Sequence, residues 1–293
     1  MIIAGYVTVI VPVHDGALSI RRCLEAIAAQ TYRPLEVVVV DDGSTDPTPA
    51  WVRSFRAAHP EILVQLVPQQ RAGTGAALAA GLEKARGEFI ALAHQADVWE
   101  PTKLARQVSR LQGAPDAAYC LAGVVEQVGG WHRARTAARV DCWPLCQGIA
   151  LSSLVARRRA IEAVGGFDPE PGLAVAHELA CRLARHGRGV RLAEVLAVCH
   201  RAPRHAMPAL AASLEKLART GRLRPEELKR GRGRVHASEG WQALLDDEPV
   251  AARQRFREAL ADDPRLPTAW LGLAFAALDR ALFASGLLRP AAR

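Results

Sequence analysis

The sequence lacks any continuous run of about twenty apolar residues, which is the length that a membrane-spanning helix requires. The apolar segment near the N-terminus is short and has the composition of a strand. No basic segment stands before it, so the secretory-signal pattern is missing too. We therefore expect a cytoplasmic protein with no transmembrane segment.

Aromatic residues are scarce, at 5% of the chain, and no basic stretch carries the interleaved aromatic side chains of a nucleic-acid surface. The formal net charge of +8 leaves nucleic acid, an anionic membrane or phosphate-bearing small ligands as possible partners. We favour phosphates, or simply an arginine-rich composition, and expect no nucleic-acid partner. The six cysteines form no paired framework, which indicates thiols in a reducing compartment.

The most informative stretch that is present covers residues 7–49. Residues 7–13 are β-branched at six of seven positions, which predicts a strand buried on both faces. Residues 18–29 carry apolar side chains at helical spacing, and residues 35–40 predict a second buried strand. A strand, a crossover helix and a parallel strand form a right-handed βαβ unit. The chain therefore begins as an α/β fold.

The alternation of strands and helices continues beyond this unit. Further strands are predicted at residues 62–67 and 88–92, and further helices at residues 48–58, at 76–86 and from 102 onward. This order predicts a mostly parallel sheet with helices on both faces. Ligands of such sheets bind at the carboxyl ends of the strands, where Asp41 and Asp42 follow the second strand. These two carboxylates are therefore candidates for contacting a ligand.

Two segments, IVPVHDG at residues 10–16 and VVVVDDGSTD at residues 37–46, resemble the nucleotide-binding start of family 2 glycosyltransferases. The resemblance implies the GT-A fold and a nucleotide-sugar partner, linked to UDP or GDP, whose base and ribose contact the acidic pair. It assigns nucleotide binding to Pro12, Val13, Asp41, Asp42, Arg71 and Asp97. The alternative for the acidic pair is that it caps the helix that follows.

The strand that ends at residue 92 departs from the family pattern. Family members carry Asp-x-Asp-Asp at its end, where a divalent cation bridges the carboxylates and the diphosphate. This chain has His94, Gln95, Ala96 and Asp97 there, so only the last carboxylate remains. His94 and Asp97 are the candidate metal ligands, but such a pair would hold Mg²⁺ or Mn²⁺ poorly. We expect metal-poor or metal-independent chemistry, and the alternative for His94 is a solvent-facing loop residue.

A second departure concerns the general base. After Gly-Gly-Phe-Asp at residues 165–168, the family carries a Glu-Asp pair whose Asp takes the proton of the acceptor hydroxyl. Val175 and Ala176 occupy those positions here, and neither can accept a proton. His177 and Glu178 follow immediately, and we consider both for a catalytic role if the helix start is displaced. The alternative is that they lie at an ordinary helix N-terminus.

Basic side chains offer a substitute for the charge of a metal ion at the diphosphate. His200 and Arg201 end a predicted strand at residues 192–201, which resembles the strand that closes the family's domain. Together with His94 and Arg71, they could stabilise a leaving phosphate as fixed cations. The alternative is that each is a solvated surface charge.

The C-terminal third of the chain changes character. We predict a glycosyltransferase-like domain at residues 1–205, a helix and charged linker at residues 206–233, and a helical segment at residues 234–293. In that segment the tetratricopeptide spacing is followed by Gly240, Ala252, Phe256, Ala259, Pro264, Trp270 and Leu273. One and a half repeats cannot bury their faces alone, so we expect them to pack on the first domain or on a second chain. The resemblance to family 2 domains fused to such repeats implies a homodimer or a protein or peptide acceptor. An unrelated helical hairpin is the alternative.

Two functions from different classes remain open at this point. In the first, the protein transfers a sugar from a nucleotide donor to an acceptor, with impaired or metal-independent chemistry. In the second, it is a catalytically inactive relative that acts as a scaffold or regulatory partner. The family resemblance favours the first function. The simultaneous departures at Ala96 and Ala176 favour the second, because two losses are harder to compensate than one.

Overall fold

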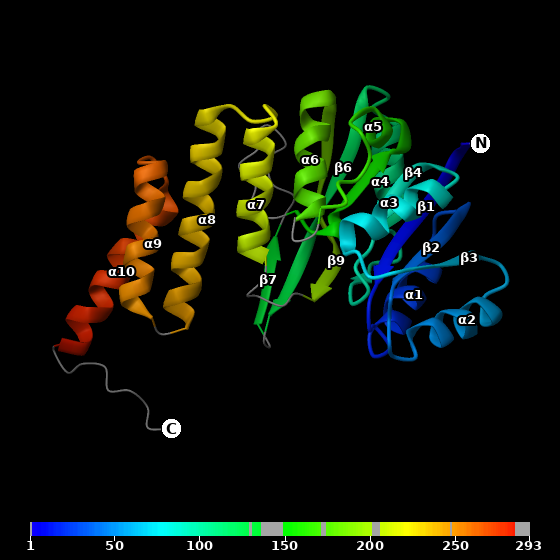
Figure 1. Cartoon of the computed structure of the whole chain (residues 1–293), viewed down its shortest axis with the longest axis horizontal. Helices are drawn as coiled ribbons and strands as arrows, with labels where there is room; N and C mark the ends of the chain where they lie inside the picture. The colour runs from blue at the N-terminus through cyan, green and yellow to red at the C-terminus, as the bar shows by residue number, and fades with distance from the viewer. Residues whose placement is uncertain are drawn as a thin grey trace. The chain divides into compact units, whose positions relative to one another are not determined.

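The computed structural model describes residues 2–128, 131–135, 149–170, 174–200, 206–246 and 248–284. The chain divides into two compact units, Met1–Arg204 and His205–Arg293. Figure 1 shows the strands within the first unit and the helices α7 to α10 of the second. Each unit is described separately below.

The first unit is built on one sheet with the strand order β3-β2-β1-β4-β8-β6-β9-β5, and β7 pairs with β6. Its strands are β1 (Ile3–Val13), β2 (Leu35–Asp42), β3 (Leu63–Gln69), β4 (Gly87–Leu92), β5 (Val98–Trp99), β6 (Ala117–Val128), β7 (Trp131–Arg135), β8 (Leu154–Arg157) and β9 (Arg188–His200). Strands β1 to β4 are parallel, as predicted. The second half is mixed, because β8 runs antiparallel to both β4 and β6.

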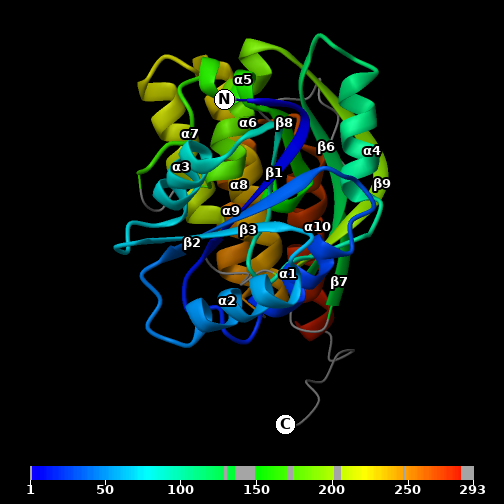
Figure 2. The same cartoon turned by 90° about the vertical axis from the view of Figure 1, so that its right-hand side faces the viewer.

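Helices cover both faces of this sheet, as expected for an α/β fold. One face is covered by α1 (Ile20–Ala28), α2 (Thr48–Ala58) and α4 (Lys103–Gln112). The other is covered by α3 (Thr74–Lys84), α5 (Arg158–Ala163) and α6 (Val175–His186). Figure 2 shows α1 and α2 on the side of the first strands opposite to α3.

The change of face has a topological cause. Right-handed crossovers from β1 to β2 and from β2 to β3 place α1 and α2 on the same face. The connection from β3 to β4 crosses back over β1, so its helix α3 lies on the opposite face. The reversal leaves a switch point between β1 and β4, where open α/β sheets bind their ligands. This places the expected site at the carboxyl ends of β1, β2 and β4.

The second unit consists of α7 (Ala206–Arg219), α8 (Pro225–Leu245), α9 (Pro249–Asp262) and α10 (Pro267–Ala284). Consecutive helices pack against one another, as Figure 1 shows. Phe256 of α9 is fully buried at the centre of its apolar core. A methyl group added at Gly240 or Gly272 would lie within 3 Å of the Phe256 ring. The glycines therefore allow α8 and α10 to approach α9 closely.

Within the segment predicted as a helix and linker, residues 206–233, helix α8 begins at Pro225 and continues unbroken to Leu245, so it is longer than the short helix expected there. The helix start is stabilised by Glu227, whose side chain accepts the backbone N–H of Arg224 at 2.8 Å. Gly231 does not interrupt the helix. Its missing side chain leaves room for Leu214 of α7, which a methyl group there would approach to 2.9 Å. Gly231 therefore permits close packing of α7 and α8 and does not mark the end of a helix.

Replacing Gly272 with Ala is expected to destabilise the second unit by about 1–3 kcal/mol, because the added methyl group overlaps a rigid, buried ring. Chemical denaturation followed by circular dichroism measures this change. The matched control is Gly113→Ala, where the nearest atom would lie at an ordinary 3.4 Å. Equal stability of the two variants would contradict the packing role of Gly272.

Candidate functional site

The predicted acidic pair lies at the switch point described above. Val13, the last residue of β1, pairs in register with Asp41 of β2. Pro12 pairs with Val40, and both Pro12 and Val13 are buried within the sheet. The two β1 residues therefore position the edge through their backbone, while the carboxylates supply its side-chain chemistry.

Asp42 is engaged within the protein by both of its carboxylate oxygens. Oδ1 accepts hydrogen bonds from the Gln69 side chain and the Ala72 backbone, each at 2.7 Å. Oδ2 accepts the backbone N–H of Gly73 at 2.8 Å. Burial alone would raise the pKa of Asp42, but these hydrogen bonds outweigh it and lower the pKa below its usual value. Asp42 is therefore an ionised anchor for the loop from Gln69 to Gly73.

Asp41 has a different environment. One of its oxygens accepts the backbone N–H of Ser44 at 3.0 Å, and the side chain is only 6% exposed. Among the described residues, the second oxygen has no hydrogen-bond partner. A nearly buried carboxylate oxygen in this position has capacity for a ligand donor. Asp41 is thus the member of the pair that is best suited to meet a ligand.

The helix-cap alternative for the acidic pair is wrong. Helix α2 begins at Thr48, and its N-cap residue Pro47 offers no side-chain cap. The carboxylate that reaches the start of this helix belongs to Asp46, which accepts the Thr48 backbone N–H at 2.9 Å. Asp41 and Asp42 bond elsewhere, as described above.

The turn after β1 and the loop after β2 are joined by reciprocal carboxylates. Asp15 accepts the backbone N–H of Thr45 at 2.8 Å, and Asp46 accepts the backbone N–H of Ala17 at 2.9 Å. The hydrogen bond from Thr45 is the main cause that holds the pKa of Asp15 below its usual value. The two loops consequently form one surface beside Asp41.

His14 and Arg71 bring a cation to this surface. The Nδ1 atom of His14 lies 2.9 Å from the carbonyl oxygen of Asp42, which can only accept, so Nδ1 carries the proton. The Nε2 atom therefore accepts a hydrogen bond from the Arg71 guanidinium. Arg71 has no carboxylate partner among the described residues, and most of its donors remain available to a ligand.

The segment after β4 is held to the turn after β1 by Gln95. Its Oε1 accepts the backbone N–H of His14 at 2.9 Å, and its Nε2 donates to the His14 carbonyl at 3.2 Å. His94 is exposed, and its Nδ1 lies 3.9 Å from Oδ1 of Asp97. Asp97 is buried, and its Oδ2 accepts the Ser152 hydroxyl at 2.6 Å. The loop thus offers one carboxylate and one imidazole.

A hard divalent cation does not fit these residues. Mg²⁺ and Mn²⁺ prefer several oxygen ligands, whereas Ala96 offers none and one oxygen of Asp97 is already hydrogen-bonded. In the part of the chain that the structure describes, no group of three or more His, Cys, Asp or Glu side chains could hold a metal ion.

The candidate catalytic residues of α6 are both buried, each only 1% exposed. Both oxygens of Glu178 accept hydrogen bonds from Arg182, at 2.7 Å and 2.6 Å. Arg182 also donates to the carbonyls of Val164 and Gly166, each at 2.7 Å. Glu178 therefore holds an arginine that binds the chain after α5, which favours a packing role. A catalytic role for His177 stays a prediction.

Of the remaining basic candidates, His200 lies among the residues that the structure describes. His200 is the last residue of β9 and pairs in register with Gln127. Arg201 lies outside the described residues. Their expected contact with a diphosphate stays a prediction.

Sequence reasoning missed three side chains that shape this region. Gln95 and Ser152 form the hydrogen bonds described above, and their partners are distant in sequence. Lys103, the first residue of α4, is fully buried, with its Nζ 3.9 Å from the centroid of the Trp99 ring. Burial lowers the pKa of Lys103 to about 7. The one available signal was a lysine among apolar positions of the predicted helix.

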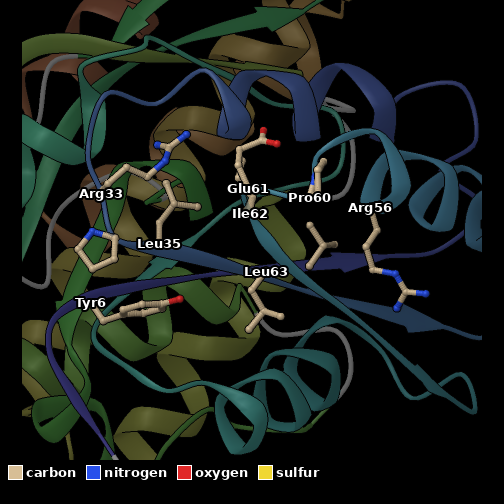
Figure 3. Close-up of a pocket in the computed structure, with 10 residues that line it drawn as sticks. Tyr6, Arg33, Leu35, Arg56, Pro60, Glu61, Ile62 and Leu63 are labelled. Carbon is tan, nitrogen blue, oxygen red and sulfur yellow. The ribbon is translucent and has the colours of Figure 1, made fainter.

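A separate cavity of about 540 Å³ lies at the opposite end of the first strands. Figure 3 shows Tyr6, Leu35 and Leu63 in its lining, together with Arg33 and Arg56. Leu35 and Leu63 are the first residues of β2 and β3, so the cavity lies at their amino ends. It is therefore distinct from the edge that carries Asp41.

Comparison with known proteins identifies the family. The model of the family described as "Glycosyl transferase family 2" matches residues 8–160, which is just over half of the chain. The chain belongs to glycosyl transferase family 2. This family 2 chain is 40% identical to the succinoglycan biosynthesis protein ExoO of Rhizobium meliloti over 109 residues. The matched region covers 37% of this chain and 30% of ExoO. The first curated relatives are covered over 30% to 37% of their own length.

Solved structures of glycosyltransferases have the same fold as this family 2 chain. The mannosyltransferase PcManGT from Pyrobaculum calidifontis, solved with GDP-Man and Mn²⁺, is 28% identical with a TM-score of 0.66, covering 93% of this chain and 79% of that one. TarS from S. aureus is 16% identical with a TM-score of 0.61, covering 88% and 81%. The predicted GT-A fold is confirmed. No helix among the described residues is both long and apolar enough to cross a membrane.

Proposed function

We propose that the protein binds a nucleotide sugar at the carboxyl edge of β1, β2 and β4 and transfers the sugar to an acceptor without a tightly held metal ion. The observation that carries this proposal is the carboxylate of Asp41. It is nearly buried at the switch point, with one oxygen in use and the other open to a donor such as the N–H of a base. The surrounding loops are already bonded to one another.

The structural relatives support this donor class. The mannosyltransferase PcManGT, solved in complex with GDP-Man and Mn²⁺, has 28% sequence identity to this chain over the aligned region. The TarS structures, one of them with UDP-GlcNAc, share about half that identity and support the fold alone. The structural relatives therefore favour a GDP-linked hexose as the donor, and the sequence resemblance leaves a UDP-linked sugar as the alternative that we also propose to test.

Charge on the departing diphosphate is the main chemical demand of the reaction. Arg71 is exposed beside Asp41's strand end, and its guanidinium is hydrogen-bonded to the His14 ring, which is itself bonded to the Asp42 carbonyl. We propose that Arg71 and His94 bind the diphosphate from this side, with His200 and Arg201 as further cations. Fixed cations in a partly water-excluded site stabilise such charge without reorganisation. Asp97 follows β4 at the same edge of the sheet, and its side chain is held by a hydrogen bond from the Ser152 hydroxyl.

A second candidate function is nucleotide-sugar binding without transfer, in a scaffold or regulatory protein. The observation that favours it is the chemistry of two positions where the family carries carboxylates. Ala96 cannot ligate a metal, and Val175 and Ala176 cannot accept a proton. Glu178, the nearest carboxylate along the helix, is bonded to Arg182 through both oxygens.

One experiment separates the two functions. Isothermal titration with UDP and GDP, in the presence of either Mn²⁺ or a chelator, measures nucleotide binding and its dependence on metal. A donor-hydrolysis assay with the matching sugar nucleotides then measures turnover. We expect binding that is insensitive to the chelator, followed by slow turnover. Binding with no turnover supports the scaffold function, and absence of binding contradicts both.

Replacing Asp41 with Asn is expected to weaken nucleotide binding about tenfold, because a hydrogen bond to a charged acceptor becomes a weaker neutral one. Titration of the variant with UDP and GDP measures the change. Asp116→Asn is the matched control, because this exposed aspartate pairs with Arg188 far from the edge. Unchanged affinity in the Asp41 variant would remove the basis of the proposed site.

A further inference from the structure

The outer face of α10 is unusually apolar for an exposed helix surface. Between Pro267 and Ala277 the helix carries no charged residue. Three large side chains on it are more than half exposed: Trp270 at 58%, Leu271 at 54% and Phe275 at 52%. Surface helices normally turn their large apolar residues inward and place charges outside. A cluster of this kind marks an interaction surface.

The inner face of the same helix explains why the large residues lie outside. Ala269 and Ala276 are fully buried, and Gly272 lies against the Phe256 ring. Small residues fill most of the contact with α9, and Leu273 packs on the same core, while Trp270, Leu271 and Phe275 stay more than half exposed. The aromatic and leucine side chains are thus left for a different contact.

The exposed rings are fixed in place and offer little polarity. The indole N–H of Trp270 donates to the carbonyl of Pro264 at 2.9 Å, so its polar atom is already satisfied. Phe275 packs edge-on against Trp241, with the ring centroids 5.8 Å apart. Trp241 in turn donates its N–H to Thr268 at 3.2 Å. A partner therefore meets a pre-ordered apolar surface, which loses little conformational freedom on binding.

We propose that this face, formed by Trp270, Leu271 and Phe275, binds the same face of a second copy of the chain. A charged partner would bury its charges against the stretch Pro267–Ala277, which offers no counter-charge, and this is unfavourable. An uncharged apolar face is complementary to itself, and a twofold interface brings identical patches together. The three side chains and their small neighbours would bury about 400 Å² per chain, the size of a weak and reversible association.

The inference is independent of the glycosyltransferase site. All residues of the face belong to the unit His205–Arg293, whereas Asp41, Arg71 and Asp97 belong to Met1–Arg204. Disrupting the dimer should leave nucleotide binding unchanged, and the Asp41→Asn variant should still dimerise. Failure of one proposal can therefore be distinguished from failure of the other.

Sedimentation velocity of the full chain over a wide range of concentrations tests the proposal. We expect a monomer–dimer equilibrium that Leu271→Glu weakens at least tenfold, because the substitution buries a charge in the interface. Leu271 is the position of choice, since no described hydrogen bond depends on it. The matched control is Val250→Glu on α9, at a side chain that is 72% exposed.

Three outcomes would overturn the proposal. The first is a wild-type protein that stays monomeric at every concentration. The second is an equal loss of dimer in the Leu271 and Val250 variants, provided that circular dichroism shows both to be folded. The third is a monomer whose α10 face binds an apolar fluorescent probe that Leu271→Glu abolishes, which would show a surface for a partner other than a second copy.

Discussion

Replacing Glu178 with Gln is expected to lower the free energy of unfolding by about 3–5 kcal/mol, because it breaks a buried ion pair and leaves the charge of Arg182 uncompensated. Both members of the pair are buried, and Arg182 also binds the carbonyls of Val164 and Gly166. The loss should therefore loosen α6 and the chain after α5 together. Denaturant unfolding monitored by circular dichroism measures the change.

The chain contains a close control for this experiment. Arg158 and Glu162 form an ion pair with the same spacing of four residues and a length of 2.7 Å, but Glu162 is 45% exposed. Glu162→Gln should change stability by less than about 1 kcal/mol, since exposed pairs contribute little. Equal effects of the two substitutions would contradict the structural role of Glu178. A stable Glu178→Gln variant without transfer activity would instead restore the catalytic hypothesis.

Replacing Lys103 with Met is expected to stabilise the protein by up to about 5 kcal/mol at pH 7. Burial is the main cause that lowers the pKa of this lysine from 10.5 to about 7, and each unit corresponds to about 1.4 kcal/mol. Met fills a similar volume beside Trp99 with no charge to desolvate. The gain is expected in spite of the lost contact between the ammonium group and the indole ring.

The dependence of this gain on pH follows from the direction of the shift. Below pH 7 the lysine is charged in both folded and unfolded states, and the full cost of burying it is present. Between pH 7 and about 10.5 the unfolded state binds more protons than the folded state, so the stability of the wild type rises with pH. The difference between Lys103→Met and the wild type should therefore shrink across this window.

Denaturation midpoints of both proteins, measured at several values of pH, test this expectation. The matched control is Lys84→Met at the exposed end of α3, which should alter neither the stability at pH 7 nor its slope with pH. A Lys103→Met protein that is less stable than the wild type at pH 7 would show that the ammonium group is needed in the core.

The parallel half of the fold could be predicted because its signals are local. The apolar run at residues 35–40 and the helical spacing at residues 48–58 correspond to β2 and α2, and α2 has the predicted bounds. The spacing of apolar residues along the sequence shows directly whether a strand or helix buries one face or two. The mixed half was harder, because pairing of β8 with β4 and β6 joins segments that are distant in sequence.

The candidate site was predictable only as a location. The two aspartates follow the same strand, yet only the fold distinguishes them, because Asp42 bonds to a loop some thirty residues away. The length of α8 was hidden from the sequence for a similar reason. Gly231 resembles a helix breaker in isolation, and only the proximity of Leu214 reveals that it permits close packing. By contrast, the spacing of Glu178 and Arg182 did carry a local signal for an ion pair.

The anchoring of the loop by Asp42 has a thermodynamic consequence for ligand entry. Three hydrogen bonds already hold the segment from Gln69 to Gly73 against the strand end. This segment is thus ordered during folding, and a nucleotide bound as proposed would meet it already in place. Ordering of the segment from Gln69 to Gly73 should then contribute little to the heat-capacity change of binding, because this segment is already fixed before the ligand enters.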